Sequence, residues 1–191
     1  MVNAMMGADE YFPITYKTNL LAGVFSVASV VWAAVGGALA LALLILYVNT
    51  LGEMRDARHL RGRVYVSEKV TAPALYGVFR PRIVIPYAME GEEGGYWLLH
   101  EQAHIRRGDN LWRMLAFATA AIHWFNPLAW VFLKCFLADL EMACDERVLR
   151  SLKEEERKEY ALALVTAAEN RTAFISAFGG AKIRTRVRRI L

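Results

Sequence analysis

One uninterrupted stretch of the chain, from Leu20 to Val48, contains no Asp, Glu, Lys, Arg or His. Its 29 residues exceed the roughly 20 that an α-helix needs to cross a bilayer. A cleaved secretory signal has an apolar core of about 7–15 residues behind a basic start, whereas Asp9 and Glu10 precede this run. A buried core helix of this length would extend roughly 43 Å, too long for the small domain that remains. The stretch therefore predicts a transmembrane helix.

The charges that flank this helix predict its orientation. Lys17 is the one Lys or Arg before it, whereas several arginines follow it closely, namely Arg55, Arg58, Arg61 and Arg63. An excess of Lys and Arg marks the cytoplasmic side of a membrane helix. We therefore expect an extracytoplasmic segment at 1–19, a membrane helix at 20–48 and a cytoplasmic domain at 49–191. Cys135 and Cys144, nine residues apart on one predicted helix, cannot reach each other, so no disulfide is expected.

The residues after the membrane helix divide into a short β-like region and a longer helical region. The β-branched runs at 63–66 and 82–86 are typical of strands. Pro73 and Pro81 favour placing this ribbon at the edge of a sheet. With 56% apolar and 22% charged residues, the composition is that of a folded chain. The fold expected is α+β, mainly helical, with a small edge β-ribbon.

The clearest chemical motif lies on a helix predicted from Tyr96 to about Arg107 and ended by Gly108. Residues 100–104 read His-Glu-Gln-Ala-His, which matches the H-E-x-x-H pattern. On a helix, His100 and His104 lie one turn apart on one face and can bind Zn²⁺, with Glu101 beside them as general base. Two surface histidines around an ordinary helical glutamate are the alternative interpretation. The motif favours a zinc site with Glu101 as catalytic residue.

A catalytic zinc usually has three protein ligands, so a third must come from elsewhere in the chain. Glu141 is the best candidate because it is an acid inside an otherwise apolar predicted helix. Asp145 lies one turn further along the same face. Glu141 can bind the metal while Asp145 accepts a hydrogen bond from the remote ring nitrogen of a ligand histidine. A solvated helix face in a charged region is the alternative for this pair.

Taken together, these motifs give the chain a specific resemblance to a known family. It resembles the BlaR/MecR-type antirepressor membrane metallopeptidases, a gluzincin-like family of bacterial beta-lactam signal transducers. The segments that carry the match are 67–86, 100–109, 123–130 and 141–149. They cover most of residues 64–150 in the family's order, and their conjunction is far more specific than the zinc motif alone.

The resemblance implies a compact zincin-like (minigluzincin) domain in a bacterial cell membrane. It places the zinc ligands at His100, His104 and Glu141, the catalytic base at Glu101, and Asp145 in support of a ligand. The implied substrate is a cytoplasmic transcriptional repressor or the enzyme's own chain. The stretch before residue 77 resembles the edge strand on which zincins bind a substrate peptide, and a plain surface hairpin is the alternative.

Full-length members of this family have additional transmembrane helices and often an extracellular penicillin-binding domain. Neither is found in these 191 residues. Beta-lactam sensing is therefore not inferred for this chain.

A second apolar stretch, from Met114 to Leu133, contains no Asp, Glu, Lys or Arg. A single membrane crossing there would put Glu141 about 30 Å from the two histidines, which is incompatible with one shared zinc. The segment is therefore expected to turn back at Asn126-Pro127, giving two helices that pack on the zinc helix or lie partly in the bilayer interface. His123 is interpreted as a packing or capping residue.

Two further features lie towards the C terminus. Residues 151–154, Ser-Leu-Lys-Glu, predict a capping box that opens a helix through about Ala168. Beyond it comes a basic tail, formed by Lys182, Arg184, Arg186, Arg188 and Arg189. We interpret the tail as a surface for anionic lipid, because no recognition helix or stacking aromatics support direct nucleic-acid binding.

The sequence favours a membrane-anchored zinc metalloendopeptidase whose partners are the lipid bilayer and a protein or peptide substrate. A catalytically silent membrane scaffold with a vestigial or structural metal site is the alternative. The intact Glu101 argues against the alternative, since a structural zinc needs no base and normally has a fourth protein ligand. The donor that would stabilise a developing oxyanion is not chosen among His123, Tyr76 and Tyr160, and the oligomeric state is not predicted.

Overall fold

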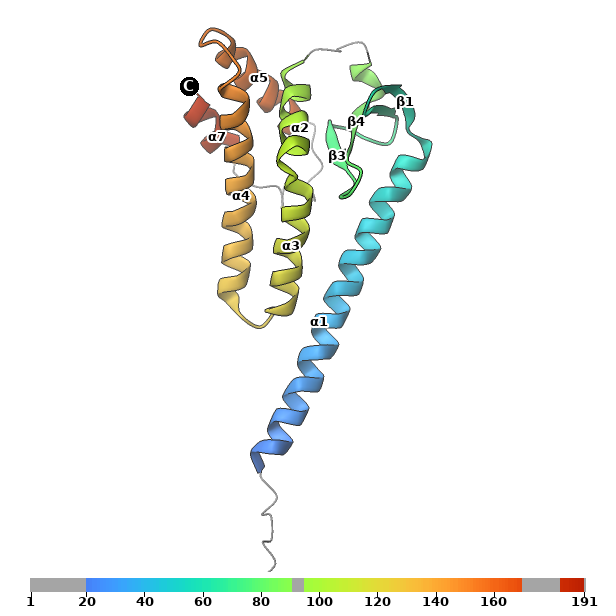
Figure 1. The fold of residues 1–191 in the computed structure, drawn as a ribbon, viewed down its shortest axis with the longest axis vertical. Coiled ribbons are helices and arrows are strands. Elements are labelled where there is room, and N and C mark those ends of the chain that lie inside the picture. The colour runs from blue at the N-terminus through green and yellow to red at the C-terminus, as the bar shows by residue number, and fades with distance from the viewer. Residues whose placement is uncertain (1–19, 91–94, 170–182, 191) are drawn as a thin grey trace, which may run out of the picture.

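The computed structural model describes residues 20–90, 95–169 and 183–190, so the predicted segment 1–19 lies outside the described residues (Figure 1). The first element, α1 (Leu20–Glu53), is a long helix whose N-terminal end extends away from the rest of the chain. Among the described residues, one helix is long and apolar enough to cross a membrane, spanning Leu21–Asp56. It fits the predicted transmembrane helix, and its helical backbone continues beyond Val48.

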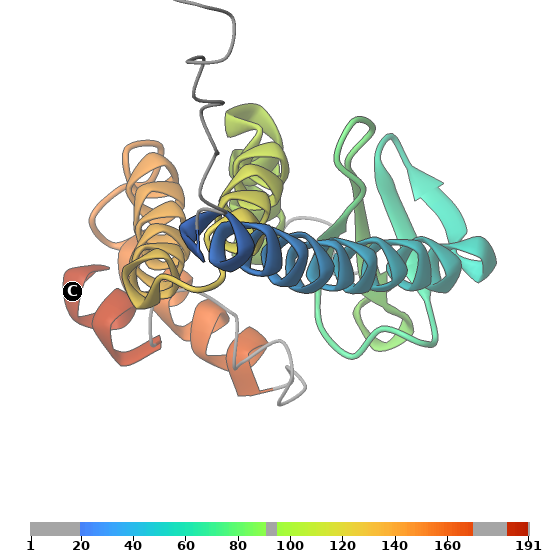
Figure 2. The same ribbon diagram turned by 90° about the horizontal axis from the view of Figure 1, so that it is seen from below.

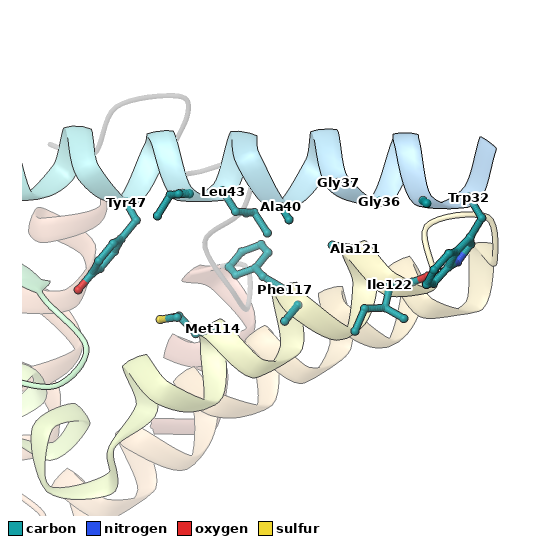
Figure 3. A pocket seen from close by; sticks show the side chains of 13 residues that line it. Trp32, Gly36, Gly37, Ala40, Leu43, Tyr47, Met114, Phe117, Ala121 and Ile122 are labelled. Carbon is teal, nitrogen blue, oxygen red and sulfur yellow. The ribbon is translucent and has the colours of Figure 1, made fainter. Parts of the chain in front are cut away.

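α1 contacts the rest of the chain through α3 (Asp109–Ile122). Trp32 Nε1 donates a hydrogen bond to the Ile122 carbonyl at 2.9 Å, and a Cβ added at Gly36 would lie 3.6 Å from the Ala121 carbonyl. From this contact the two helices diverge towards Tyr47 and enclose an apolar groove of about 580 Å³ (Figure 3). α1 is therefore anchored to the domain near one end of the groove and splayed from it at the other.

A four-stranded sheet follows α1, after a short 3₁₀ turn, η3 (Met54–Asp56). Its strands are β1 (Arg58–Arg61), β2 (Val64–Ser67), β3 (Ala74–Tyr76) and β4 (Arg82–Pro86). The spatial order is β1-β2-β4-β3. β2 and β4 pair in parallel, and the two outer pairs are antiparallel. A second 3₁₀ turn, η4 (Tyr87–Met89), ends the sheet region.

The predicted edge ribbon is half right. β3 does lie at an edge, but β4 is a central strand that pairs on both sides. Pro81 precedes β4 and Pro86 is its last residue, so neither proline removes an amide from the middle of the strand. The charged strand β1 was not predicted, because its Arg-His-Leu-Arg sequence lacks an apolar run.

The sheet packs on α2 (Tyr96–Arg107) through one of three hydrophobic clusters. Ile83 and Ile85 of β4 are fully buried and meet Trp97 and Leu98 of α2, with Val66 from β2 completing the cluster. Alternate residues of a strand share a face, so Ile83 and Ile85 point to α2 together. This packing fixes the sheet beside α2, and Figure 2 shows the sheet on one side of α2 and α3, with α4, α5 and α7 on the other.

α2 has the bounds that the sequence predicted, and it ends at Gly108 as expected. Gly108 adopts a left-handed conformation with φ of 68°, and its amide bonds to the carbonyls of His104 and Ile105. This conformation is accessible to glycine without strain. The chain then turns directly into α3, so Asp109, the first residue of α3, lies beside the last turn of α2.

α3 and α4 (Pro127–Leu149) form the predicted helical hairpin. Asn126 caps α4 by accepting a hydrogen bond from the Leu128 amide, and Pro127 occupies the first turn. The two helices pack through buried alanines and leucines, namely Ala116, Ala120, Leu133, Leu137 and Leu140. The turn at residues 123–126 therefore brings the C-terminal half of α4 back to α2, while apolar side chains near the tip stay exposed, including Ile122, Phe125 and Leu128.

The last elements, α5 (Glu156–Glu169) and α7 (Ile183–Ile190), pack on α2 and α4. The core they share includes Cys144, Val148, Tyr160, Leu164 and Ile190. The predicted capping box is wrong, because α5 begins at Glu156, not after Ser151. The Ser151 hydroxyl donates a hydrogen bond to the Val148 carbonyl, in the last turn of α4. The Lys153 amide donates a hydrogen bond to the Glu156 carboxylate. Only the carboxylate half of a capping box is therefore present, at the bond between Lys153 and Glu156.

Candidate metal centre

The H-E-x-x-H residues lie on the buried face of α2, with His100, Glu101 and His104 all buried. The Nε2 atoms of His100 and His104 are 3.1 Å apart, and their rings are nearly perpendicular at a centroid distance of 4.6 Å. One helical turn separates the two residues, so both side chains leave the helix in the same direction. α2 thus presents two imidazole nitrogens to one point.

Glu141 of α4 meets these nitrogens from the opposite side. Its Oε2 lies 3.6 Å from His100 Nε2, and its Oε1 lies 3.6 Å from His104 Nε2. Zinc bonds of 2.0–2.2 Å at tetrahedral angles separate ligand atoms by about 3.3–3.6 Å. Within the described part of the chain, Glu141 Oε2 is buried and makes no hydrogen bond, although Arg186 Nη1 lies 3.2 Å from it as an ion-pair partner. Two imidazoles and a carboxylate at these separations fit a zinc ion.

The remote nitrogen of His100 faces Asp145 and Tyr160. His100 Nδ1 lies 3.3 Å from Asp145 Oδ1 and 3.0 Å from the Tyr160 hydroxyl, which itself donates to Asp145 Oδ1 at 2.7 Å. Because a carboxylate on this side holds the N–H on Nδ1, Nε2 is left free to bind a metal. Asp145 therefore lies beside the remote ring nitrogen of His100, and its support of a metal ligand stays a prediction.

His104 has a corresponding carboxylate that sequence reasoning did not assign. Asp109 Oδ2 lies 2.6 Å from His104 Nδ1, and Asp109 is nearly inaccessible to solvent. Arg107 Nε donates to both Asp109 oxygens. The sequence does contain a signal for this contact. Asp109 comes directly after Gly108, the glycine that ends α2, and five residues after His104. A turn of the chain at Gly108 can bring the Asp109 carboxylate back to the His104 ring.

Replacing Asp109 with asparagine is expected to weaken zinc binding by about 10–100-fold, because the neutral amide no longer fixes the His104 tautomer. Competition with a colorimetric zinc chelator measures the affinity. Asp139→Asn removes an exposed acid of α4 and provides the matched control. Equal affinities in the two variants would show that Asp109 does not support the metal ligand.

Cys144 offers a different third donor. Its side chain is fully buried, and Sγ lies 3.3 Å from the His100 carbonyl and 3.6 Å from His100 Nδ1. Together with His100 and His104 it forms a cluster compact enough for a metal ion. The thiol lies near the Nδ1 side of His100, whereas Glu141 lies near Nε2, so we favour Glu141 as the ligand. Cys144 and Cys135 are both free, as expected.

The hydrogen bonds and charges of the site shift the pKa values of its residues in the direction opposite to burial. Burial lowers the pKa of His104, but the hydrogen bonds to Asp109 and Cys144 and the charge of Glu141 together outweigh burial and raise the pKa to about 9. Burial raises the pKa of Glu141, but hydrogen bonding from His100 and the charges of His104 and Arg113 hold that pKa well below its usual range. Glu141 therefore stays ionised, and a metal ion that binds the imidazoles displaces protons from them.

The basic tail is where the structure most clearly corrects the sequence interpretation. Arg186, assigned with its neighbours to a lipid surface, is 5% exposed and pairs with Asp145. Arg184, Arg188 and Arg189 are exposed, and Lys182 lies outside the described residues. α7 is amphipathic, and its apolar face packs on the α4–α5 core, which turns Arg186 inward. Arg113 of α3 also forms an ion pair with Glu141, which the sequence did not indicate.

The three candidate oxyanion donors lie in different places. His123 ends α3, where its Nδ1 is 3.0 Å from the Thr119 carbonyl, so its predicted capping position is confirmed. Tyr160 lies on the Nδ1 side of His100, away from the two facing Nε2 atoms. Tyr76 belongs to the edge strand β3, whose following residue Gly77 accepts a hydrogen bond from Asn110 Nδ2 at 2.7 Å. This bond ties the edge strand to the start of α3, beside α2.

An H-E-x-x-H helix with a glutamate supplied by a second helix defines a metallopeptidase-type centre. The chain belongs to the BlaR1 peptidase M56 family, whose family model matches residues 16–190. It is 30% identical over 116 residues to the regulatory protein BlaR1 of Bacillus licheniformis, covering 58% of this chain and 19% of that protein.

The chain is also 30% identical over 98 residues to the methicillin resistance mecR1 proteins of Staphylococcus aureus and Staphylococcus epidermidis. These matches cover 49% of this chain and 17% of each relative. The chain thus spans about a fifth of the length of the curated relatives it matches. This is the family that the motifs at 67–86, 100–109, 123–130 and 141–149 resemble.

Proposed function

We propose that the chain is a membrane-anchored zinc metalloendopeptidase that acts in signal transduction. The proposal is carried by three groups that face one another: His100 Nε2, His104 Nε2 and the Glu141 carboxylate lie 3.1–3.6 Å apart. Glu101 is buried on α2, the helix that carries the two histidines. Membership of a peptidase family supports the same activity. A silent scaffold would require neither a buried glutamate in the motif nor carboxylates behind both histidines.

In the proposed mechanism, His100, His104 and Glu141 hold the zinc. When bound there, zinc supplies Lewis acidity that activates a water molecule and polarises the scissile carbonyl. Glu101 takes the proton from that water and later delivers it to the leaving amine. Asp145 and Asp109 keep the two imidazoles in the orientation that exposes their Nε2 atoms.

The substrate in this proposal is an extended peptide segment bound along β3. β3 lies at the edge of the four-stranded sheet, and an edge strand is the element to which an extended peptide can add by backbone pairing. It lies beside α2 and is tied to α3 by the Asn110 to Gly77 hydrogen bond. By the resemblance to the family, the protein cleaved is a cytoplasmic transcriptional repressor or the enzyme's own chain.

We place the catalytic domain on the cytoplasmic side of a bacterial cell membrane. The argument is the cluster of arginines that follows α1, formed by Arg55, Arg58, Arg61 and Arg63. Two fusions to the C terminus test this orientation: one to a reporter that is active only in the cytoplasm, and one to a reporter that is active only after export. Activity of the second reporter alone would reverse the orientation.

The zinc content of the detergent-purified protein tests the proposed function. Wild type is expected to carry near-stoichiometric zinc, and both His104→Ala and Glu141→Ala are expected to lose most of it, because each removes one of three ligands. His123→Ala, which removes an exposed histidine from the hairpin, is the matched control and should keep its metal. Absence of zinc from the wild type after metal supplementation would instead support the silent scaffold.

A further inference from the structure

α7 delivers one arginine of the basic tail into the metal centre. Its apolar residues Ile183, Val187 and Ile190 pack on the core shared by α4 and α5. Arg186, on the same helix, is 5% exposed, whereas Arg188 is exposed to solvent. A charge is rarely buried to this degree unless it is fully paired. The partners of Arg186 therefore indicate what it does.

Arg186 contacts two carboxylates of α4 at once. Its Nε donates to Asp145 Oδ2 and its Nη2 to Asp145 Oδ1, each at 2.7 Å. Its Nη1 lies 3.2 Å from Glu141 Oε2. The two bonds to Asp145 form the bidentate fork that the planar guanidinium favours.

Glu141 and Asp145 need such a partner because of their positions on α4. They are four residues apart on one face, both buried, and like charges at this spacing repel each other. Arg113 also pairs with Glu141 from α3, but among the described residues Arg186 is the cation that contacts both carboxylates. With Arg186 between them, Glu141 faces the Nε2 atoms of the two histidines while Asp145 faces His100 Nδ1.

We propose that Arg186 is a positioning residue of the metal centre, so that α7 is a structural part of the site. It joins Asp145 to Glu141 and thereby fixes both the carboxylate ligand and the support of His100. The inference rests on the proposed function, because it takes Glu141 and His100 as metal ligands. It assigns to the tail a role that the charge of the segment alone does not suggest.

The opposite role for Arg186 is a plug that competes with the metal. Its Nη2 lies 3.4 Å from His100 Nε2, one of the atoms assigned to the zinc. The two roles predict opposite effects of removing the side chain. A positioning residue strengthens metal binding, whereas a plug weakens it.

The test measures metal affinity of the full chain in detergent, stripped with a chelator and titrated with Co²⁺ and Zn²⁺. Arg186→Ala is expected to bind both metals about 10–100-fold more weakly than wild type, and to alter the visible spectrum of bound Co²⁺. Arg186→Lys is expected to remain defective, because an ammonium cannot form the fork. Arg188→Ala, an exposed arginine on the same helix, is the matched control and should match wild type.

Chemical rescue separates positioning from a general loss of folding. A cleft of about 260 Å³ between α4 and α7 reaches Asp145 and Arg186, so added guanidinium can enter the space that Arg186→Ala vacates. Guanidinium is expected to restore metal affinity and the Co²⁺ spectrum in this variant. It should have no such effect on the Arg188→Ala protein.

Three results would overturn the inference while leaving the proposed function intact. They are unchanged affinity in Arg186→Ala, tighter binding in that variant, and weaker binding that guanidinium leaves unchanged. Tighter binding would identify Arg186 as a plug. Failure of the wild type to bind either metal would overturn the proposed function itself, and the inference with it.

Discussion

Replacing Glu101 with glutamine is expected to lower peptide-bond cleavage by about 10²–10⁴-fold while zinc binding is retained. Glutamine keeps the size of the buried side chain but cannot accept the proton from water. The three proposed metal ligands are unaffected, since Glu101 is not among the donors that face one another. Loss of activity with full metal content is the signature of a missing general base.

A measurement that does not require the natural substrate suits this variant. Purified protein is incubated with peptides from a digested bacterial proteome, and new N termini are counted by mass spectrometry. Arg106→Gln, at an exposed position of α2, is the matched control and should cleave like wild type. Cleavage by Glu101→Gln at the wild-type rate would show that another group serves as base.

Truncating Tyr160 to alanine is expected to destabilise the domain by about 3–5 kcal/mol, the usual cost of removing a large aromatic side chain from a core. Tyr160 is fully buried between α5 and the back of His100, and its ring contacts Tyr96 as well. Tyr160→Phe retains the ring but removes the hydroxyl that donates to Asp145. It is expected to cost about 1–3 kcal/mol, because a buried acceptor loses its donor.

Urea unfolding in detergent, followed by tryptophan fluorescence, measures both losses. Leu162→Ala, at an exposed position of α5, is the control and should change stability by less than about 0.5 kcal/mol. If Tyr160→Ala were as stable as this control, the packing of α5 against the metal helix would not contribute to the fold.

The metal helix was predicted well because its signals are local. The bounds of α2, its end at Gly108 and the face shared by His100 and His104 all follow from helical periodicity and from the preference of glycine for left-handed backbone. Glu141 and Asp145 could be paired for the same reason, since a spacing of four residues on one helix fixes a common face.

Strand order was less predictable, because it depends on which strands meet across long loops. Pro81 favoured an edge position for β4, yet β4 pairs with both β2 and β3. A proline excludes a strand from the sheet interior only where its missing amide would be needed. The register of the sheet decides where that is, and register is a tertiary property.

The amino-acid sequence by itself determined an apolar helix long enough for a membrane, a metal-binding helix, and a hairpin that must return Glu141 to the histidines. Only the tertiary structure decided that Asp109 reaches His104 and that Arg186 enters the site. Both depend on how separate elements pack. Asp109 is positioned by the turn at Gly108, and Arg186 by the docking of α7 on a core formed by α4 and α5. In the sequence, a buried arginine and a solvated one have the same charge, and what distinguishes them is the pair of carboxylates that the fold brings within reach.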